Sequence, residues 1–407
     1  MKRSFCGQDV IDAYARIADY VEETPLVHSM YLSNAQQNVY LKMESLQSTK
    51  SFKIRGCLNK MLSLNDEEKA KGVITVSSGN HGVSVAYGAK LLGIREAVII
   101  VPKTTPQSKV DKIRYFGGQV MMMGQNYDEA HVQGMQYVKS HDYTFIDSYY
   151  DDPFIYAGQG TIALEILKQN PQIDTILVPV GGGGLVSGIA YAMKHIKPDC
   201  KVYGVEAGSA ASMQASLAAG QIVKLENAAT IADGIAVKAP GDQTLAVCKT
   251  YLDGIITVSE DEIAAGILTL LEKMKMVAEG AGAVSVAAAM FEKLDLHGKN
   301  CVAVLSGGNI DVNFLSKIID LGLMKTGRKV ILDVPLVDKP GNLSKLLHLI
   351  STSGANVVSV DHNRYSDDML SGICTVRCMI ETTSEAHIGQ LLDTLFAHGF
   401  HAKIQAR

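Results

Sequence analysis

Short apolar runs rich in Val and Ile alternate with longer stretches of helical spacing between about residues 73 and 310. Runs that are apolar at every position predict strands buried on both faces and separated by helices, which is typical of parallel sheets in an α/β fold. The predicted strands are residues 73–76, 97–101, 119–123, 143–147, 175–180, 201–206, 254–258 and 301–306. In the helix after the second strand, Thr105 is the predicted N-cap and Pro106 the first helical residue.

The pattern changes near residue 328, after a predicted helix and a linker that contains Gly327. A strand over residues 329–337 leads into a helix with Pro340 near its start and Gly354 at its end. Two strands with alternating apolar positions, a second helix and a short last strand follow. The order βαββαβ predicts a ferredoxin-like unit, which we place as a separate domain at residues 328–407.

The composition, with 47% hydrophobic and 20% charged residues, is that of a globular chain. The net charge of −4 and the lack of a basic block argue against binding to nucleic acid or to an anionic membrane surface. No apolar run reaches the ~18 residues of a membrane span, and the first residues become polar too early for a signal peptide. The seven scattered cysteines, from Cys6 onward, indicate buried thiols in a reducing compartment, so we expect a cytoplasmic protein.

The histidines and cysteines show no metal-ligand spacing. Cys374 and Cys378 make a poor pair of ligands, because they lie within one predicted strand with three residues between them. We predict that the histidines of the C-terminal domain are surface or packing residues. They are His348, His362, His387, His398 and His401.

Four consecutive glycines, Gly181 to Gly184, lie between a predicted strand and a predicted helix. Backbone N–H groups at such a helix start, together with the helix dipole, suit a phosphate group. No lysine follows where a nucleotide-triphosphate loop requires one, and the glycine spacing does not match a dinucleotide-binding loop. We prefer a ligand with a single phosphate to the simpler interpretation of a tight turn.

Two other predicted strands also end in small polar loops. The first loop consists of Ser77, Ser78, Gly79, Asn80 and His81. This helix start suits a carboxylate, although a capped turn without a ligand is the alternative. The His81 side chain is more typical of a structural histidine than of a catalytic base. Ser306 follows another strand, at the edge where open α/β sheets bind ligands.

The stretch LQSTKSFKIRGC, residues 46–57, is rich in basic side chains. A solvated surface is the simpler interpretation of such a run, and we predict surface positions for Lys50 and Lys60, with Arg55 supporting a helix start. Lys53 has another interpretation. A phosphate site, a carboxylate site and a lysine with no phosphate role together fit one cofactor, pyridoxal phosphate held as a Schiff base.

The motifs SFKIRG, SSGNHG, GGGGL and SGGN occur in the order found in the fold-type-II pyridoxal-phosphate enzymes. Over residues 17–321 the chain resembles their threonine/serine dehydratase group, which also contains serine racemases. The tail, through VDKPGNLSKLLHLI, resembles an ACT domain, a small-molecule sensing module. The resemblance implies a tryptophan synthase β-like catalytic region at residues 1–322, with a smaller subdomain at about residues 45–145 inserted in a larger one.

The resemblance also implies a role for each motif. Lys53 would bind the cofactor and act as the base at Cα, and Phe52 would pack near the cofactor ring. Asn80 would contact the ring hydroxyl and Ser306 the ring nitrogen. Backbone N–H groups of Gly181, Gly182, Gly183, Gly184 and Leu185 would bind the phosphate. Ser77, Ser78, Gly79 and His81 would line the substrate carboxylate site.

The implied activity is conversion of L-threonine to 2-oxobutyrate and ammonia, and of L-serine to pyruvate and ammonia. The main alternative is a serine racemase with dehydratase side activity, because the racemases share a serine at Ser78 that acts as acid and base opposite the lysine. A catalytically silent amino-acid sensor is a further alternative. The ACT-like domain favours a regulated dehydratase.

The divalent-metal site of the racemases is incomplete in this sequence. Glu206 is present and Ala210 offers a carbonyl group, but Ser212 occupies the place of an expected aspartate. A carboxylate-poor site favours a monovalent cation, or none, over Mg²⁺.

The ACT-like domain is expected to bind a small-molecule effector after its first strand. The expected residues are Asp338, Gly341, Asn342 and Leu343. A dimerisation domain without an effector is the alternative. We expect a homodimer or homotetramer.

Overall fold

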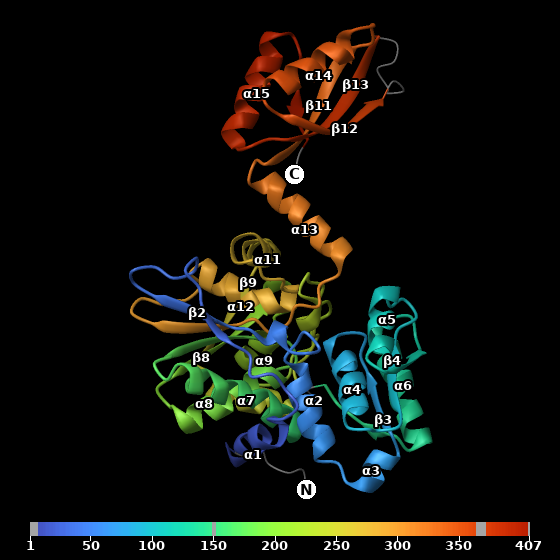
Figure 1. Cartoon of the computed structure of the whole chain (residues 1–407), viewed down its shortest axis with the longest axis vertical. Helices are drawn as coiled ribbons and strands as arrows, with labels where there is room; N and C mark the ends of the chain where they lie inside the picture. Colours follow the sequence, from blue (N-terminus) through green and yellow to red (C-terminus); the bar gives the residue numbers. More distant parts are fainter. Residues whose placement is uncertain (1–6, 149–151, 364–371, 406–407) are drawn as a thin grey trace. The chain divides into compact units, whose positions relative to one another are not determined.

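The structure is a computed structural model that describes residues 7–148, 152–363 and 372–405. The chain divides into two compact units, Met1–Asp311 and Val312–Arg407 (Figure 1). Cys6 and the last two residues of the predicted ACT-like domain lie outside the described residues. Within the described ranges, no helix has the length and apolar character needed to cross a membrane.

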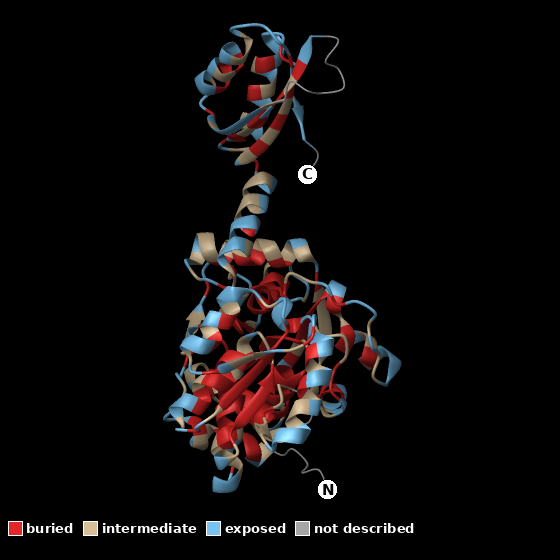
Figure 2. Ribbon diagram, turned by 90° about the vertical axis from the view of Figure 1, so that its right-hand side faces the viewer, coloured by how far each residue is buried: buried red, intermediate tan, exposed pale blue. Residues whose placement is uncertain are grey.

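The first unit contains a six-stranded sheet with the order β1-β2-β10-β7-β8-β9. Neighbouring strands are parallel, except that β1 and β2 are antiparallel. The strands are β1 (Leu26–His28), β2 (Asn38–Lys42), β7 (Thr175–Pro179), β8 (Lys201–Ala207), β9 (Gly254–Val258) and β10 (Asn300–Val304). Figure 2 shows buried residues concentrated in the strands of this sheet, and β7 is buried at every position.

Helices cover this sheet and bury its apolar side chains. Helices α7 (Pro153–Gln169), α8 (Gly184–Ile196) and α10 (Asp242–Tyr251) share one hydrophobic core with β7, β8 and β10. Helix α12 (Gly280–Met290) is made of small residues and packs against β7 to β10. The other helical segments are α1 (Gly7–Ile17), η1 (Glu44–Leu46), η2 (Gly208–Ala210), α9 (Ser212–Ala219), η3 (Asp233–Ile235) and α11 (Glu260–Met274).

A second, four-stranded parallel sheet of the first unit has the order β5-β4-β3-β6. Its strands are β3 (Val73–Val76), β4 (Ala97–Val101), β5 (Gln119–Met122) and β6 (Thr144–Phe145). The helices of this region are α2 (Lys53–Leu62), α3 (Asp66–Ala70), α4 (Asn80–Leu91), α5 (Gln107–Tyr115) and α6 (Tyr127–His141). Two sheets in one α/β unit, parallel throughout except for the β1–β2 pair, confirm the predicted fold class.

The start of α5 differs from the prediction. Pro106 is the N-cap, with extended backbone at ψ 141°, and the helix begins at Gln107. The hydroxyl of Thr105 is buried without a hydrogen-bond partner, so it does not cap the helix. Proline has no N–H to hydrogen-bond and tolerates either position, which is why the pattern could not separate them.

The second unit contains a four-stranded antiparallel sheet with the order β12-β13-β11-β14. Burial alternates along β11 and β13, as expected for a sheet with one face packed against helices. The elements are α13 (Val312–Lys325), β11 (Lys329–Val337), α14 (Asn342–Thr352), β12 (Asn356–Asn363), β13 (Ile373–Glu381), α15 (Glu385–Ala397) and β14 (Lys403–Ile404). The order βαββαβ from β11 to β14 confirms the predicted ferredoxin-like unit.

Helix α13 groups with the second unit, although we placed the end of the catalytic region at residue 322. A salt bridge of 2.8 Å between Lys329 and Asp320 joins the helix to the start of β11. Only Ile318 of this helix is buried, so its apolar pattern could not assign it to either core. The domain boundaries stay a prediction.

Candidate active site

The segment before Lys53 pairs with the loop after β10. The N–H of Phe52 donates to the carbonyl of Ser306 at 3.0 Å, and the N–H of Gly308 donates to that of Lys50 at 2.9 Å. Residues from distant parts of the chain therefore meet at the carboxyl end of the large sheet. Ser306 is buried, and its hydroxyl donates to the carbonyl of Ala281 at 3.3 Å.

Lys53 is the first residue of α2, and its side chain lies near the ring of Phe52. Its Nζ is 5.3 Å from the ring centroid and donates to the carbonyl of Ser148 at 3.4 Å. Burial lowers the pKa of the Lys53 ammonium, although the carboxylates of Asp147 and Glu279 act in the opposite direction. A lowered pKa increases the fraction of neutral amine, the form that attacks a carbonyl carbon.

The polar loop after β3 forms the N-terminus of α4. The hydroxyl of Ser77 accepts a hydrogen bond from the N–H of Gly79 at 3.3 Å, and Asn80 begins the helix. Ser77 and Ser78 are partly exposed and Gly79 is exposed, so this helix start is open to a ligand. The structure thus combines N–H groups and hydroxyls suited to an anion.

The imidazole of His81 is packed inside the protein. Its Nδ1 lies 3.3 Å from the sulfur of Cys57, and its Nε2 lies 3.0 Å from the carbonyl oxygen of Ile146. Burial, reinforced by the charge of Lys53, lowers the pKa of His81 to about 3. The ring is therefore neutral at physiological pH and serves as a packing group beside the site.

Glu279 is a site residue that the sequence did not indicate. Its Oε1 accepts a hydrogen bond from Nδ2 of Asn80 at 2.7 Å, and Asn80 also accepts one from Nδ2 of Asn309. Burial, with a contribution from Asp233, raises the pKa of Glu279 to about 7. The carboxyl group thus titrates close to Lys53 in the pH range where enzymes work.

The glycine loop joins β7 to α8 in a crowded place. Gly183 has a φ of +95° and is the N-cap of α8. A Cβ there would lie 2.6 Å from Cε of Met213, and one on Gly181 would lie 2.9 Å from Cα of Ile235. The hydroxyl of Thr244 donates to the carbonyl of Gly182 at 2.7 Å. Only glycine lets this backbone adopt its turn between such neighbours.

Leu185 follows the loop in the first turn of α8. Its side chain belongs to the buried core between α8 and the large sheet, and Phe52 packs against that same core. The glycine loop and the Lys53 segment are therefore in contact with one hydrophobic cluster.

Glu206 lies at the carboxyl end of β8, and its carboxylate already has two partners. One oxygen accepts from the N–H of Met213 at 2.9 Å, and the other from the N–H of Gln214 at 2.8 Å. Burial raises the pKa of Glu206 to about 7. Nearby Ala210 is buried, and the buried hydroxyl of Ser212 has no hydrogen-bond partner. Binding of a monovalent cation at Glu206 and Ala210 stays a prediction.

The four expected effector residues lie between β11 and α14 in the second unit. Asp338 and Gly341 are exposed, and Gly341 is the N-cap of α14 with a φ of +92°. Nδ2 of Asn342 donates to the carbonyl of Val337 at 2.9 Å, which fixes the loop on β11. Leu343 packs against the core of this unit.

Arg55 is fully buried and does more than support a helix start. Its guanidinium donates to both carboxylate oxygens of Glu44, at 2.7 and 2.8 Å, and to both of Glu165, at 2.6 and 2.8 Å. Lys42 donates to Glu165 as well, at 2.5 Å. Burial alone would raise the pKa of Glu44, but Arg55 holds it below its usual value. This cluster anchors α2 two residues after Lys53.

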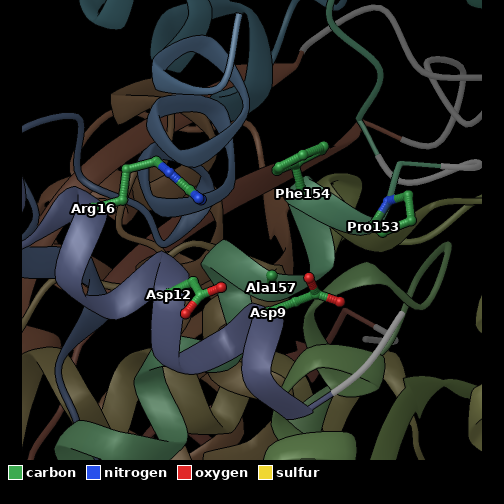
Figure 3. Close-up of a pocket in the computed structure, with 6 residues that line it drawn as sticks. All are labelled: Asp9, Asp12, Arg16, Pro153, Phe154 and Ala157. Carbon is green, nitrogen blue, oxygen red and sulfur yellow. The ribbon is translucent and has the colours of Figure 1, made fainter. Parts of the chain in front are cut away.

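A small pocket lies between α1 and the start of α7 (Figure 3). It is lined by Asp9, Asp12, Arg16, Pro153, Phe154 and Ala157. Its cavity of about 10 Å³ has room for no more than one water molecule, so it does not bind an amino acid.

Comparison with known proteins agrees with the motifs. A family profile described as pyridoxal-phosphate dependent enzyme matches residues 17–307. The L-threonine ammonia-lyase of Thermotoga maritima is 44% identical over 398 residues, covering 98% of each chain. A threonine deaminase from Solanum lycopersicum has a similar structure, with a TM-score of 0.74 at 40% identity over 77% of this chain and 92% of that one. Maize serine racemase has a TM-score of 0.73 at 34% identity, over 79% of this chain and 99% of that one.

Proposed function

Because this chain belongs to the family of pyridoxal-phosphate-dependent enzymes, we propose that it converts L-threonine to 2-oxobutyrate and ammonia. L-Serine, which lacks the methyl group, would give pyruvate and ammonia. The observation that carries the proposal is the 44% identity to a protein named L-threonine ammonia-lyase along 98% of both chains. The likeness extends through the second unit, so it covers more than the catalytic fold.

The residues of the site fit pyridoxal phosphate. The glycine loop leaves no space for side chains at Gly181 and Gly183 and presents a helix N-terminus, which suits a phosphate group. Asn80 and Ser306 offer polar atoms for the ring hydroxyl and the ring nitrogen. When bound, the cofactor supplies an aldehyde that condenses with amines and a ring that takes up the electron pair left on Cα.

Lys53 has two tasks in this proposal. Its amine would hold the cofactor, and in its free form it would take up the proton from Cα of the substrate. Burial lowers the pKa of the ammonium, which keeps more of the amine neutral and able to accept that proton. The ring of Phe52 lies beside this amine, 5.3 Å from Nζ to the ring centroid.

The N-terminus of α4 would hold the substrate carboxylate. The backbone N–H of His81 and the hydroxyls of Ser77 and Ser78 are the proposed donors, and the exposed Gly79 lines the same site. A carboxylate fixed there orients Cα toward Lys53. Loss of the β-hydroxyl as water leaves an enamine, which hydrolyses to the 2-oxo acid and ammonia.

Racemisation of L-serine is the second candidate activity. Ser78 supports it, because its partly exposed hydroxyl follows β3 at the carboxylate site and is a candidate proton donor to Cα.

We further propose that a small molecule bound at the loop before α14 regulates the enzyme. We also propose that the protein is a homodimer or homotetramer and that it is cytoplasmic. The buried thiols among the described cysteines support a reducing compartment.

Product analysis with the full chain and added pyridoxal phosphate tests the activity. We expect 2-oxobutyrate from L-threonine, and we expect Lys53→Ala to abolish it. Lys60→Ala is the matched control, since this lysine lies on the same helix in a partly exposed salt bridge with Asp152. Chiral separation of the products from L-serine measures racemisation. D-Serine without any 2-oxo acid from threonine would overturn the proposal, and the lack of a borohydride-sensitive visible absorbance would indicate a silent sensor.

A further inference from the structure

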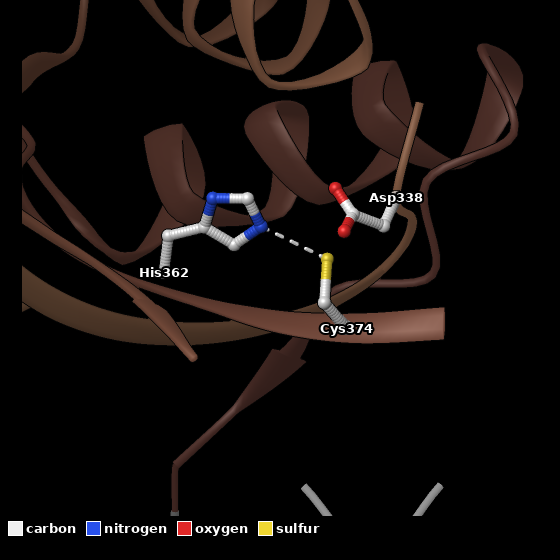
Figure 4. A group of neighbouring side chains, drawn as sticks. All are labelled: Asp338, His362 and Cys374. Carbon is white, nitrogen blue, oxygen red and sulfur yellow. Dashed lines mark hydrogen bonds between the residues drawn. The ribbon is translucent and has the colours of Figure 1, made fainter. Parts of the chain in front are cut away.

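We propose that the ferredoxin-like unit binds a zinc-type divalent cation between Asp338, His362 and Cys374 (Figure 4). One potential ligand atom from each residue lies within 4.8 Å of the other two. Across the described ranges of the chain, this is the one place where three such side chains meet. The proposal does not depend on the lyase activity, because metal binding is measured directly.

The sheet brings the three residues together from separate segments. Strands β12, β13 and β11 are neighbours in that order. Cys374 on β13 is paired with Leu336, two residues before Asp338, and His362 on β12 is paired with Val376. Figure 4 shows the three side chains pointing toward one another on the side of the strands where the helices lie.

The distance between the histidine and cysteine ligand atoms is slightly shorter than in a tetrahedral zinc site. Nε2 of His362 and Sγ of Cys374 are 3.0 Å apart. Bond lengths of about 2.3 Å to sulfur and 2.0–2.2 Å to nitrogen or oxygen place tetrahedral ligands about 3.3–3.6 Å apart. The histidine and cysteine therefore need to separate by about half an ångström. Asp338 is exposed, and one of its carboxylate oxygens lies within 4.8 Å of both other ligand atoms.

Cys374 is buried and held in place. Its relative exposure is 2%, and its thiol donates to the carbonyl of Leu336 at 3.2 Å. His362 is partly buried and Asp338 is exposed, so the solvent exposure of the three side chains increases from Cys374 to Asp338. A cation can therefore enter from the side of Asp338 while the sulfur stays fixed.

The donor set selects the class of cation. A thiolate, an imidazole and a carboxylate suit zinc, whereas Mg²⁺ and Ca²⁺ prefer oxygen ligands alone. On binding, a zinc–sulfur bond forms and the thiol proton passes to solvent. Three protein ligands leave one position for water or a small molecule, and Asp338 begins the loop that we assigned to the effector.

Zinc titration of the full chain loaded with pyridoxal phosphate tests the proposal. We expect one Zn²⁺ per chain by calorimetry and elemental analysis. Zinc X-ray absorption should show one sulfur at about 2.3 Å with nitrogen and oxygen at about 2.0–2.2 Å. The variants are Asp338→Asn, His362→Gln and Cys374→Ser. Each should weaken binding about a hundredfold or more, because even groups behind the ligands contribute 10–100-fold.

Each variant has a matched control that lies outside the cluster. Asp361→Asn, His348→Gln and Cys378→Ser change the same residue types in the same unit and should bind zinc normally. Asp338→Asn alters only an exposed loop side chain, so it keeps the test valid if Cys374→Ser fails to fold. No stoichiometric binding, equal binding by all the variants, or a shell without sulfur would overturn the proposal.

Discussion

Replacement of Arg55 by methionine should destabilise the first unit strongly. The guanidinium has no exposed surface and donates to both oxygens of Glu44 and of Glu165. With Lys42 it makes a buried group of two cations and two carboxylates. Methionine fills much of the same volume but leaves one carboxylate without a counter-charge.

The cost follows from the burial of that charge. Removing one partner of a buried ion pair costs about 3–5 kcal/mol, whereas an exposed pair contributes about 0–1 kcal/mol. A unit of this size loses about 2 °C of melting temperature per kcal/mol, so Arg55→Met should melt about 6–10 °C lower. Lys168→Met is the exposed control, since Lys168 and Glu23 are 60% and 42% exposed.

Far-ultraviolet circular dichroism is the appropriate measurement, because the chain has no tryptophan for fluorescence. The double variant Arg55→Met/Glu44→Gln restores neutrality around Lys42 and Glu165, and it should recover part of the lost melting temperature. A melting temperature for Arg55→Met within about 2 °C of wild type, equal to that of Lys168→Met, would refute the reasoning.

Three further substitutions test the site. Gly183→Ala should weaken binding of pyridoxal phosphate about tenfold or more, because its Cβ would crowd neighbouring atoms. Gly220 has the same left-handed backbone but nothing within 4 Å of the place where a Cβ would lie, so Gly220→Ala should bind the cofactor normally. Equal affinities of the two variants would contradict this. Glu279→Gln should remove an inflection near pH 7 from the pH profile of 2-oxobutyrate formation, because the pKa of this group is raised to about 7. The pKa of Glu206 is raised from 4.5 to about 7, so the folded state binds this proton more tightly. Wild type should therefore lose up to about 3 kcal/mol of stability between pH 4.5 and 7, and urea unfolding of Glu206→Gln should lack that loss; equal slopes would count against it.

The strands that could be predicted are continuous apolar runs, as in β4 and β7. Strand β2 could not be predicted in this way, because it ends in Lys42, whose charge suggests a solvent-exposed position. That charge is buried only because Glu165, 123 residues further along, neutralises it. Local patterns contain no information about such a distant partner.

Prediction of the candidate site from the sequence has the same limit, because distant partners are not visible in local patterns. Lys53 and the glycine loop could be proposed from the sequence because their motifs occur together, although the residues beside the lysine did not distinguish it. Glu279 belongs to no motif, and its place directly before a helix of small residues is the one signal that points to it. Arg55 was predicted only to support a helix start, because Glu44 and Glu165, which neutralise its charge, lie outside its motif. His362 and Cys374 showed no ligand spacing because they lie on different strands.

The pairing of β2 with β10 also bears on how the chain folds during synthesis. Asn38 and Asn300, hydrogen-bonded at 3.0 Å, are 262 residues apart. The small sheet is made from one continuous stretch, residues 73–145. Closing long loops costs chain entropy and slows folding, so the small sheet can assemble on the ribosome while the large sheet still lacks β10. The contacts of Phe52 with the loop after β10, which frame Lys53, are among the last to form in the first unit.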